Sequence, residues 1–168
     1  MISPKEIAIE YGTPALIPSF RRTLDRVARE KVYIEITRAF PLKQVRAFQL
    51  QLMRKKAPIF YAVHEGKVVG WIDISWPENP RMKHRGRLGM GLLPEYRGLG
   101  IGGRLMTAAL RQAKKCKLEK VELQVYTSNK RAIALYEKMG FKVEGQIKRY
   151  RKVGSRYFDC MCMGKFLR

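Results

Sequence analysis

The chain has 168 residues, which is enough for a buried core, and we expect residues 1–168 to form a single domain. Its 46% hydrophobic and 29% charged residues are ordinary for a globular protein, and no apolar run approaches the ~20 residues that a membrane-spanning helix needs. Residues 1–10 lack the apolar core of a signal peptide. The sequence therefore predicts a cytoplasmic protein that does not associate with a membrane.

Charge is the unusual property of the composition, since 35 Lys and Arg against 14 Asp and Glu give a net charge of +21. Such a field attracts polyanions, which include nucleic acid, ribosomes and phosphorylated cofactors. No basic block is long enough to resemble a nucleic-acid-binding arm. A solvated surface is the favoured interpretation, and contact with RNA or the ribosome stays open as an alternative.

The cysteines Cys116, Cys160 and Cys162 are odd in number and do not indicate a disulfide framework. Cys160 and Cys162 would share one face of a strand, but a tetrahedral metal site needs more ligands than they and the two histidines offer. We predict buried thiols and no metal.

The first half of the chain predicts a strand, two helices and a hairpin. Residues 6–11 alternate as a strand, and 14–31 read as a helix that Thr13 would cap, with Pro14 in its first position. Residues 33–40 connect to a second helix opened by Pro41. Residues 59–64 and 67–75 read as strands joined by the two-residue turn Glu65-Gly66.

The second half predicts four more strands and two more helices. Residues 76–86 are a polar loop, and 87–93 are a strand whose two glycines indicate a bulge or the close approach of another backbone. A glycine-rich turn at 94–100 leads to a helix at 101–115, a strand at 120–126 and a helix at 129–139. Two closing strands fill 140–166 around Gly154-Ser155. The order β-α-α-β-β-β-α-β-α-β-β predicts an α/β fold with a mixed sheet and helices on its faces.

The segment from Leu92 to Gly103 carries the clearest chemistry. Pro94 ends the strand, and a turn rich in glycine opens directly into a helix. Helix N-termini present unpaired N–H groups and a positive dipole end, and glycines at 98, 100, 102 and 103 let an anion approach that backbone. The segment is therefore a predicted phosphate cradle.

Two other phosphate motifs fit the same segment less well. Gly98, Gly100 and Gly103 satisfy the G-x-G-x-x-G pattern of dinucleotide sites, with Glu122 about 20 residues beyond. However, residues 94–97 separate the strand from the first glycine, and the rest of the chain offers too few βαβ units. A Walker A loop is excluded, because no Gly-Lys-Ser/Thr follows.

Two motifs together resemble the GCN5-related N-acetyltransferase (GNAT) family. The run Arg97-Gly98-Leu99-Gly100-Ile101-Gly102 matches its R/Q-x-x-G-x-G/A signature, with a lead-in at residues 92–96. Residues 129–141 are similar to its N-x-x-A-x-x-L-Y-x-x-x-G-F helix. The resemblance covers roughly residues 5–166 and implies the GNAT fold, acetyl-CoA as cosubstrate and transfer of an acetyl group to an amine.

The resemblance also implies roles for individual residues. Backbone amides of Arg97, Gly98, Leu99, Gly100, Ile101, Gly102 and Gly103 would hold the pyrophosphate of acetyl-CoA. The pantetheine arm would pair with Gly91, Leu92 and Leu93, where one amide would polarise the thioester carbonyl. Asn129 would bind the pantetheine or adjacent backbone, and Tyr136 would protonate the departing thiolate. The alternative for Tyr136 is packing on Phe141.

The acceptor amine must lose a proton, so a base or a water relay is needed. Asp73 and Glu35 are the candidates, with Glu122 as a third. Asp73 lies between Ile72 and Ile74 in a predicted strand, where a carboxylate needs a reason or an exposed sheet face. Glu35 lies in the segment that closes over the acceptor site in this family, although any solvated loop could hold it.

The acceptor is less determined than the cosubstrate. Residues 145–159 are similar to the ending of a bacterial branch that includes small-amine, amino-acid and ribosomal-protein acetyltransferases. A polycation such as spermidine would be repelled by the charge of +21, so we expect a small neutral or anionic amine such as an amino acid. The alternatives are a ribosomal-protein N-terminus or aminoacyl-tRNA, and a CoA-sensing domain without catalysis. A homodimer is left open.

Overall fold

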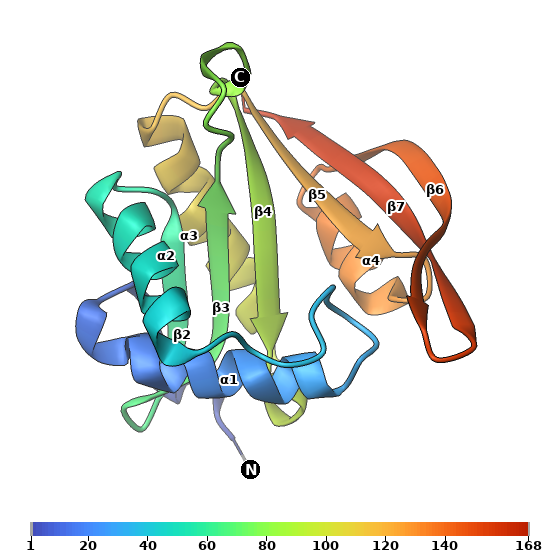
Figure 1. Cartoon of the computed structure of the whole chain (residues 1–168). Helices are drawn as coiled ribbons and strands as arrows, with labels where there is room; N and C mark the ends of the chain where they lie inside the picture. Colours follow the sequence, from blue (N-terminus) through green and yellow to red (C-terminus); the bar gives the residue numbers. More distant parts are fainter. Residues whose placement is uncertain (1, 168) are drawn as a thin grey trace.

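The computed structural model describes residues 2–167. Its elements follow the predicted order and build a mixed α/β fold (Figure 1). They are β1 (Ala8–Tyr11), α1 (Ile17–Arg29), α2 (Leu42–Arg54), β2 (Ile59–His64), β3 (Lys67–Ser75), β4 (Arg85–Leu92), α3 (Ile101–Lys115), β5 (Lys120–Tyr126), α4 (Lys130–Lys138), β6 (Lys142–Val153) and β7 (Arg156–Phe166). Among residues 2–167, no helix is both long and apolar enough to cross a membrane.

The strands form one sheet in the order β1-β2-β3-β4-β5-β7-β6. Every neighbouring pair is antiparallel except β4 and β5, which run parallel. β4 and β5 pair only where Arg85–Arg87 lie beside Lys120–Glu122, and beyond that point the two strands diverge (Figure 1). We call this divergence the split, and it determines where a ligand can enter the sheet.

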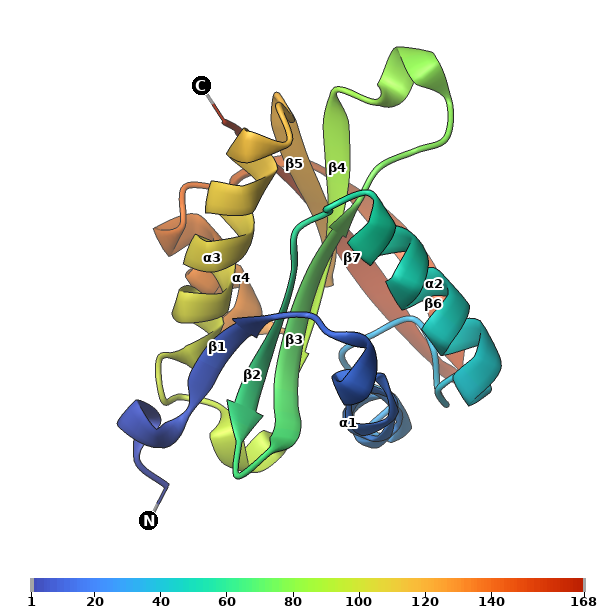
Figure 2. The same ribbon diagram turned by 90° about the vertical axis from the view of Figure 1, so that its left-hand side faces the viewer.

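Helices cover both faces of the sheet, with α1 and α2 on one side and α3 and α4 on the other (Figure 2). Ile17, Phe20 and Val27 of α1 are buried, as the helical spacing of apolar residues predicts. On the other face, Leu105 and Met106 of α3 are fully buried. The core thus lies in two layers that hold β3 and β4 from both sides.

Several local predictions are confirmed and others are corrected. The β2–β3 turn has positive φ at both Glu65 (48°) and Gly66 (70°), as a two-residue hairpin turn requires. The first strand begins at Ala8 because Pro4–Glu6 form a 3₁₀ turn, and α1 begins at Ile17 because Pro14–Leu16 form another. The prediction that the Thr13 side chain caps the helix is wrong, since it makes no capping hydrogen bond.

Gly89 and Gly91, the two glycines of the predicted strand 87–93, do not mark a bulge, because the β3–β4 register runs without a shift from Gly70–Leu92 to Ser75–Arg87. Neither do they admit another backbone. A Cβ on Gly91 would lie 2.3 Å from the Trp71 ring, so an indole occupies the space. Gly89 lies across from Asp73, and a Cβ there would be 3.7 Å from the carboxylate.

Candidate active site

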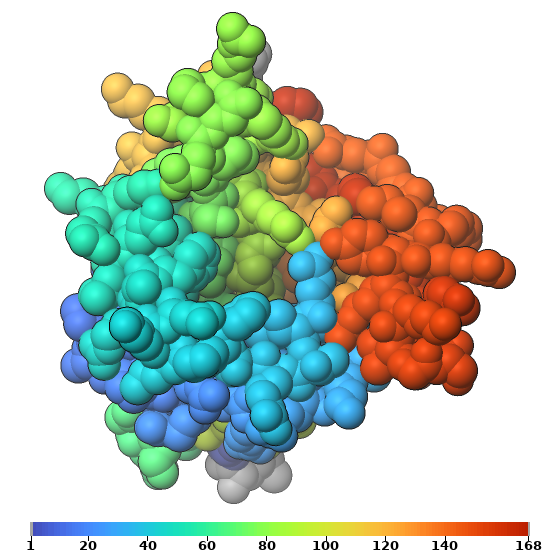
Figure 3. All heavy atoms as spheres, viewed as in Figure 1, coloured from blue at the N-terminus to red at the C-terminus, as the bar shows by residue number. Residues whose placement is uncertain are grey.

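A cleft of about 1190 Å³ opens at the split. Its walls come from β3, β4, β5, β6 and β7, from the starts of α3 and α4, and from α1, α2 and the connection between them. In Figure 3 the molecule is hollowed at this position, between residues 30–50 on one side and the β6–β7 hairpin on the other. The cleft is therefore bounded by segments far apart in the sequence.

The predicted phosphate cradle forms one boundary of the cleft. Pro94–Tyr96 turn as a 3₁₀ helix, Gly98 and Gly100 follow with φ of 82° and 76°, and α3 begins at Ile101. The first intrahelical bond runs from the Arg104 N–H to the Gly100 carbonyl at 3.3 Å. The amides before Arg104 belong to the first turn of α3 and the loop before it, where helix geometry supplies no partner.

Each glycine of the cradle has its own physical reason. Gly98 and Gly100 need positive φ, and a Cβ on either would meet nothing within 4 Å, so the space beside them is open. Gly102 is needed for packing, because a Cβ there would lie 2.9 Å from the Leu135 side chain. A Cβ on Gly103 would lie 4.0 Å from the same side chain, which is ordinary contact. Open space beside backbone amides at a helix start fits a phosphate group.

The Arg97 side chain does not point to this space. Its Nη1 and Nη2 donate to the two Glu30 oxygens at 2.8 and 2.5 Å, its Nε donates to the Leu92 carbonyl at 2.9 Å, and it lies over the Tyr33 ring. The bond to Glu30 raises the pKa of Arg97. Its backbone amide is also used, by the Pro94 carbonyl at 3.2 Å. Arg97 therefore holds the cradle in place, and the amides from Gly98 onward remain for an anion.

The inner edge of β4 offers amides to the split. Leu93 N–H donates to the Val69 carbonyl of β3 at 2.9 Å. This amide is therefore already bonded within the sheet and is not free to bind the pantetheine arm, contrary to the prediction. Because antiparallel ladders alternate, the amides of Leu92 and Met90 face away from β3, toward the split. Gly91, Met90 and Leu92 all line the cleft.

Asn129 and Tyr136 reach the cleft from α4. Asn129 caps this helix, since its side-chain oxygen accepts the Ala132 N–H at 3.3 Å, which is the adjacent-backbone role among those predicted. Tyr136 is buried, and its ring packs on Phe141 with centroids 6.0 Å apart. Burial raises the pKa of the Tyr136 hydroxyl, so it stays protonated at neutral pH. Tyr136 thus packs on Phe141 and also lines the cleft, so the two predicted roles do not exclude each other.

Asp73 lies in the cleft wall on β3. Burial raises its pKa to about 7, while a hydrogen bond from Gln49 of α2 opposes that shift. Gln49 is itself fixed, because its Oε1 accepts the Tyr61 hydroxyl at 2.7 Å. A carboxyl group with a pKa near 7 can take a proton from an amine and return it to water.

Glu35 lies in the α1–α2 connection and also lines the cleft. Its Oε1 accepts from Arg87 Nη2 at 2.9 Å and from the Tyr150 hydroxyl at 2.5 Å. Gln124 accepts from the same two groups, at 3.0 and 3.1 Å. This hydrogen bonding raises the pKa of Tyr150 to about 12. With both donors on one carboxylate oxygen, Glu35 is committed to holding Arg87 and Tyr150.

Four of the predicted site residues do not line the cleft, and they are Leu93, Leu99, Ile101 and Glu122. Glu122 pairs with Arg85 at 2.8 Å and does not line the cleft, so it is not placed to act as a base. Ile101 is buried in the core and Leu99 packs against it, so their side chains anchor the cradle.

Cys160 is buried as predicted and lines the cleft, but Cys116 and Cys162 are only partly buried. The described residues contain no group of three or more metal ligands.

Sequence reasoning missed Gln49, Arg87 and Gln124. Gln49 had a signal, because it is a polar residue beside the apolar face of Val45, Phe48 and Leu52. Arg87 and Gln124 had none, since each reaches the site through strand register and the position of the split.

A mixed sheet that splits beside a glycine-rich helix start defines the GNAT class of folds. Solved structures of this class match over nearly the whole chain. The GNAT acetyltransferase from Streptococcus pneumoniae has a TM-score of 0.88 and 24% identity, covering 96% of this chain and 99% of that one. The protein yncA from Salmonella typhimurium, solved with acetyl-CoA, has a TM-score of 0.90 and 17% identity, covering 96% and 94%.

The chain belongs to the Acetyltransferase (GNAT) family, whose model matches residues 24–141. It is 28% identical over 102 residues to the L-amino acid N-acetyltransferase AaaT of Escherichia coli K12, which covers 60% of this chain and 63% of that protein. It is 35% identical over 112 residues to an N-alpha-acetyltransferase of Sulfurisphaera tokodaii, covering 61% and 67%. The match thus spans about two thirds or less of these relatives' length.

Proposed function

We propose that the chain is an acetyl-CoA-dependent N-acetyltransferase that transfers the acetyl group directly to a primary amine of a small molecule, an amino acid or similar. The observation that carries the proposal is that one cleft is lined by the cradle, by Tyr136 and by Asp73. Lys130 and Arg131 line the same cleft and add positive charge for phosphate. The E. coli relative, named as an L-amino acid N-acetyltransferase, supports this class of acceptor.

Acetyl-CoA, when bound, supplies a thioester carbon for the amine to attack. The amides of Gly98–Gly103 bind its pyrophosphate, and an amide on the inner edge of β4 donates to the thioester oxygen. Asp73 takes the proton that the amine loses as the C–N bond forms. Tyr136 gives its proton to the sulfur as the C–S bond breaks. Since the amine attacks directly, no covalent intermediate on the enzyme is required.

Thiol release from acetyl-CoA against a panel of amines tests the proposal. The panel holds amino acids, polyamines, aminoglycosides, N-terminal peptides and aminoacyl-tRNA. We expect turnover of a small amine, and Tyr136→Phe should lower kcat by ~10² or more, because the variant loses only the hydroxyl that donates the proton. Tyr157→Phe, on an exposed tyrosine outside the cleft, is the matched control. Tight acetyl-CoA binding without turnover of any amine would refute the proposal and favour the CoA-sensing alternative.

A second candidate is an enzyme that acetylates a ribosomal-protein N-terminus or aminoacyl-tRNA. The exposed end of the β6–β7 hairpin favours it: Arg149 and Lys152 each lie 5.2 Å from the Tyr157 ring, and Arg156 lies 4.8 Å from the Phe158 ring. Cations interleaved with aromatic rings suit nucleic acid. Turnover restricted to RNA-borne or peptide amines would select this candidate. A cytoplasmic location, a bacterial source and a homodimer stay predictions.

A further inference from the structure

The strand register brings Arg87 close to Asp73. On β3, Asp73 and Ser75 share a sheet face, and their partners across the ladder on β4 are Gly89 and Arg87. Arg87 is therefore the diagonal neighbour of Asp73, a position typically about 7–8 Å away and somewhat less between the Cβ atoms. Gly89 has no side chain to stand between them, and all four residues line the cleft.

The Arg87 guanidinium is held in place and still has free N–H donors. Its Nη2 donates to Glu35 of the α1–α2 connection and to Gln124 of β5. These bonds take two of the five N–H donors of an arginine, and the side chain is 55% exposed at the cleft. Arg87 thus keeps donors free for an anion in a fixed position.

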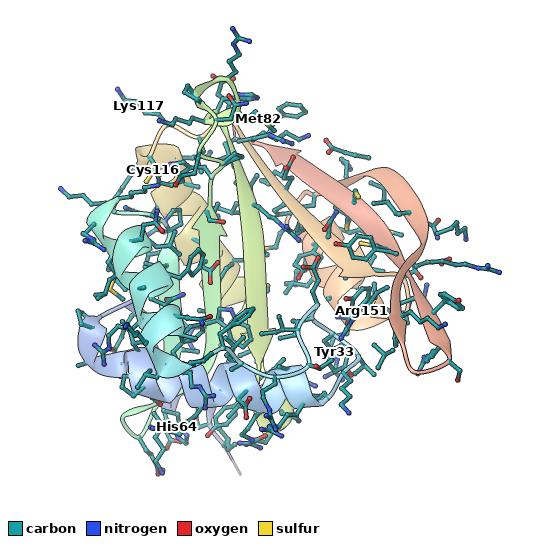
Figure 4. The ribbon with its side chains drawn as sticks, in the orientation of Figure 1. Tyr33, His64, Met82, Cys116, Lys117 and Arg151 are labelled. Carbon is teal, nitrogen blue, oxygen red and sulfur yellow. The ribbon has the colours of Figure 1, made fainter. Side chains whose placement is uncertain are left out.

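Positive charge extends beyond Arg87 on this side of the cleft. Arg151 of β6 donates to the Ile34 carbonyl at 2.6 Å, next to Glu35, and Figure 4 shows Arg151 and Tyr33 on the same side of the molecule, beside the connection. Glu35 neutralises one cation only, and its carboxylate oxygen already accepts two hydrogen bonds. Arg151 does not itself line the cleft, so Arg87 is the cation at this end of the cleft that can contact an anionic group.

An α-amino acid presents its two charged groups close together, because its amine nitrogen and carboxyl carbon are separated by about 2.5 Å. Two polar side chains that are neighbours on one sheet face can therefore contact both groups of one molecule, and a charge-assisted hydrogen bond from an arginine to a carboxylate is a strong one.

We propose that the acceptor is an α-amino acid with a free carboxylate, which Arg87 binds while Asp73 receives the amine. This inference rests on the proposed function and assigns the specificity of that same cleft. Arg87 contacts the substrate, and Glu35 and Gln124 are positioning residues for its guanidinium. A peptide N-terminus lacks this carboxylate, so Arg87 separates free amino acids from peptides.

The test compares each amino acid with its carboxamide as acceptor, in the intact protein and in Arg87→Gln. We expect the variant to raise KM for the amino acid by about 10- to 100-fold, through loss of charged hydrogen bonds, and to leave KM for the carboxamide within about twofold. The ratio of variant to wild type for each substrate cancels their different amine basicities. Arg87→Lys, which keeps the charge, should recover part of the loss.

Arg85→Gln is the matched control, because Arg85 lies on the same face two residues earlier, pairs with Glu122 and does not line the cleft. Arg85→Gln should change KM for the amino acid and KM for its carboxamide by the same factor. If Arg87→Gln also changes KM for the amino acid and for the carboxamide equally, Arg87 has only a structural role. The inference is then overturned, while the proposed function stands. Wild-type turnover of amines without a carboxylate in preference to amino acids overturns it too. No turnover of any small amine instead overturns the proposed function itself.

Discussion

Asp73 is the half-buried residue that should set the pH dependence of the proposed reaction. Its pKa of about 7 means that the proton-accepting form is lost as pH falls through neutrality. We expect kcat/KM to fall about tenfold per pH unit below pH 7. In Asp73→Asn, activity should be low and only the titration of the acceptor amine should remain. A pH profile of thiol release measures both, and an unchanged acid limb in the variant would exclude Asp73 as the base.

The same pKa predicts a stability effect with a definite sign. An unfolded aspartate has a pKa of about 4. Between that value and about 7, the folded state binds more protons than the unfolded state, so the free energy of unfolding falls as pH rises. Asp73→Asn should therefore be more stable than wild type at pH 8, with the difference closing toward pH 4. Urea unfolding at several pH values checks this, and a difference independent of pH would contradict the raised pKa.

A substitution at Gly100 tests whether the cradle needs a left-handed backbone conformation at this position. Its φ of 76° costs a residue with a Cβ about 1–2 kcal/mol, although the space beside it is open. Gly100→Ala should therefore lower the free energy of unfolding by about that amount and raise KM for acetyl-CoA. Gly145→Ala is the control, because its Cβ would also meet nothing within 4 Å and its φ is not positive. Equal effects of the two changes would show that the left-handed backbone is not what Gly100 supplies.

At the scale of elements, one ion pair ties the end of α1 to the entrance of the cradle. Arg97 and Glu30 bond through both nitrogens and both oxygens, and their side chains are 18% and 24% exposed. Glu30→Gln should lower the free energy of unfolding by about 1.5–3 kcal/mol and weaken acetyl-CoA binding.

Glu95→Gln is matched to this change in charge and chemistry. Its pair with Arg26 is far more exposed, so the expected loss is under about 1 kcal/mol. Denaturant unfolding of the two variants side by side gives the comparison. If Glu95→Gln proves as costly as Glu30→Gln, burial is not what makes the Arg97 pair strong.

The elements themselves were largely predictable, because local signals define them. Helix 101–115 and strand 120–126 have the predicted bounds, since glycine and apolar spacing define both. Errors fell at the ends of β1 and α1, where prolines favoured 3₁₀ turns over the expected strand and helix.

The site was predictable only where a motif runs along one segment. The cradle and the α4 helix are such segments, and the cradle glycines, Asn129 and Tyr136 do line the cleft. Gln49, Arg87 and Gln124 come from α2, β4 and β5, and strand order and register bring them together. β7 inserts between β5 and β6, so the hairpin reaches the α1–α2 connection through tertiary contacts that no local pattern encodes.

At the scale of the molecule, the net charge of +21 poses a question that the cleft does not answer. Phosphates of a cosubstrate need only a few cations, and most of the excess lies elsewhere. The tip of the β6–β7 hairpin concentrates part of it, because Arg149, Lys152 and Arg156 are exposed and lie over aromatic rings. A docked polyanion would lie close to the cleft, since Tyr150 and Arg151 of the same hairpin contact the α1–α2 connection.

Charge placement can be separated from charge amount with two triple variants. One changes Arg149, Lys152 and Arg156 to Gln, and the other changes Arg111, Lys114 and Lys115, which are exposed on α3. If the hairpin tip docks single-stranded RNA, the first variant should reduce the slope of log K against log salt by about 0.7 for each lost phosphate contact, and the second should not. Small-amine turnover should stay within about twofold in both, because none of the six residues lines the cleft. Equal losses of RNA affinity would mean that RNA responds to the overall field, and the favoured solvated surface would then be sufficient to explain the charge.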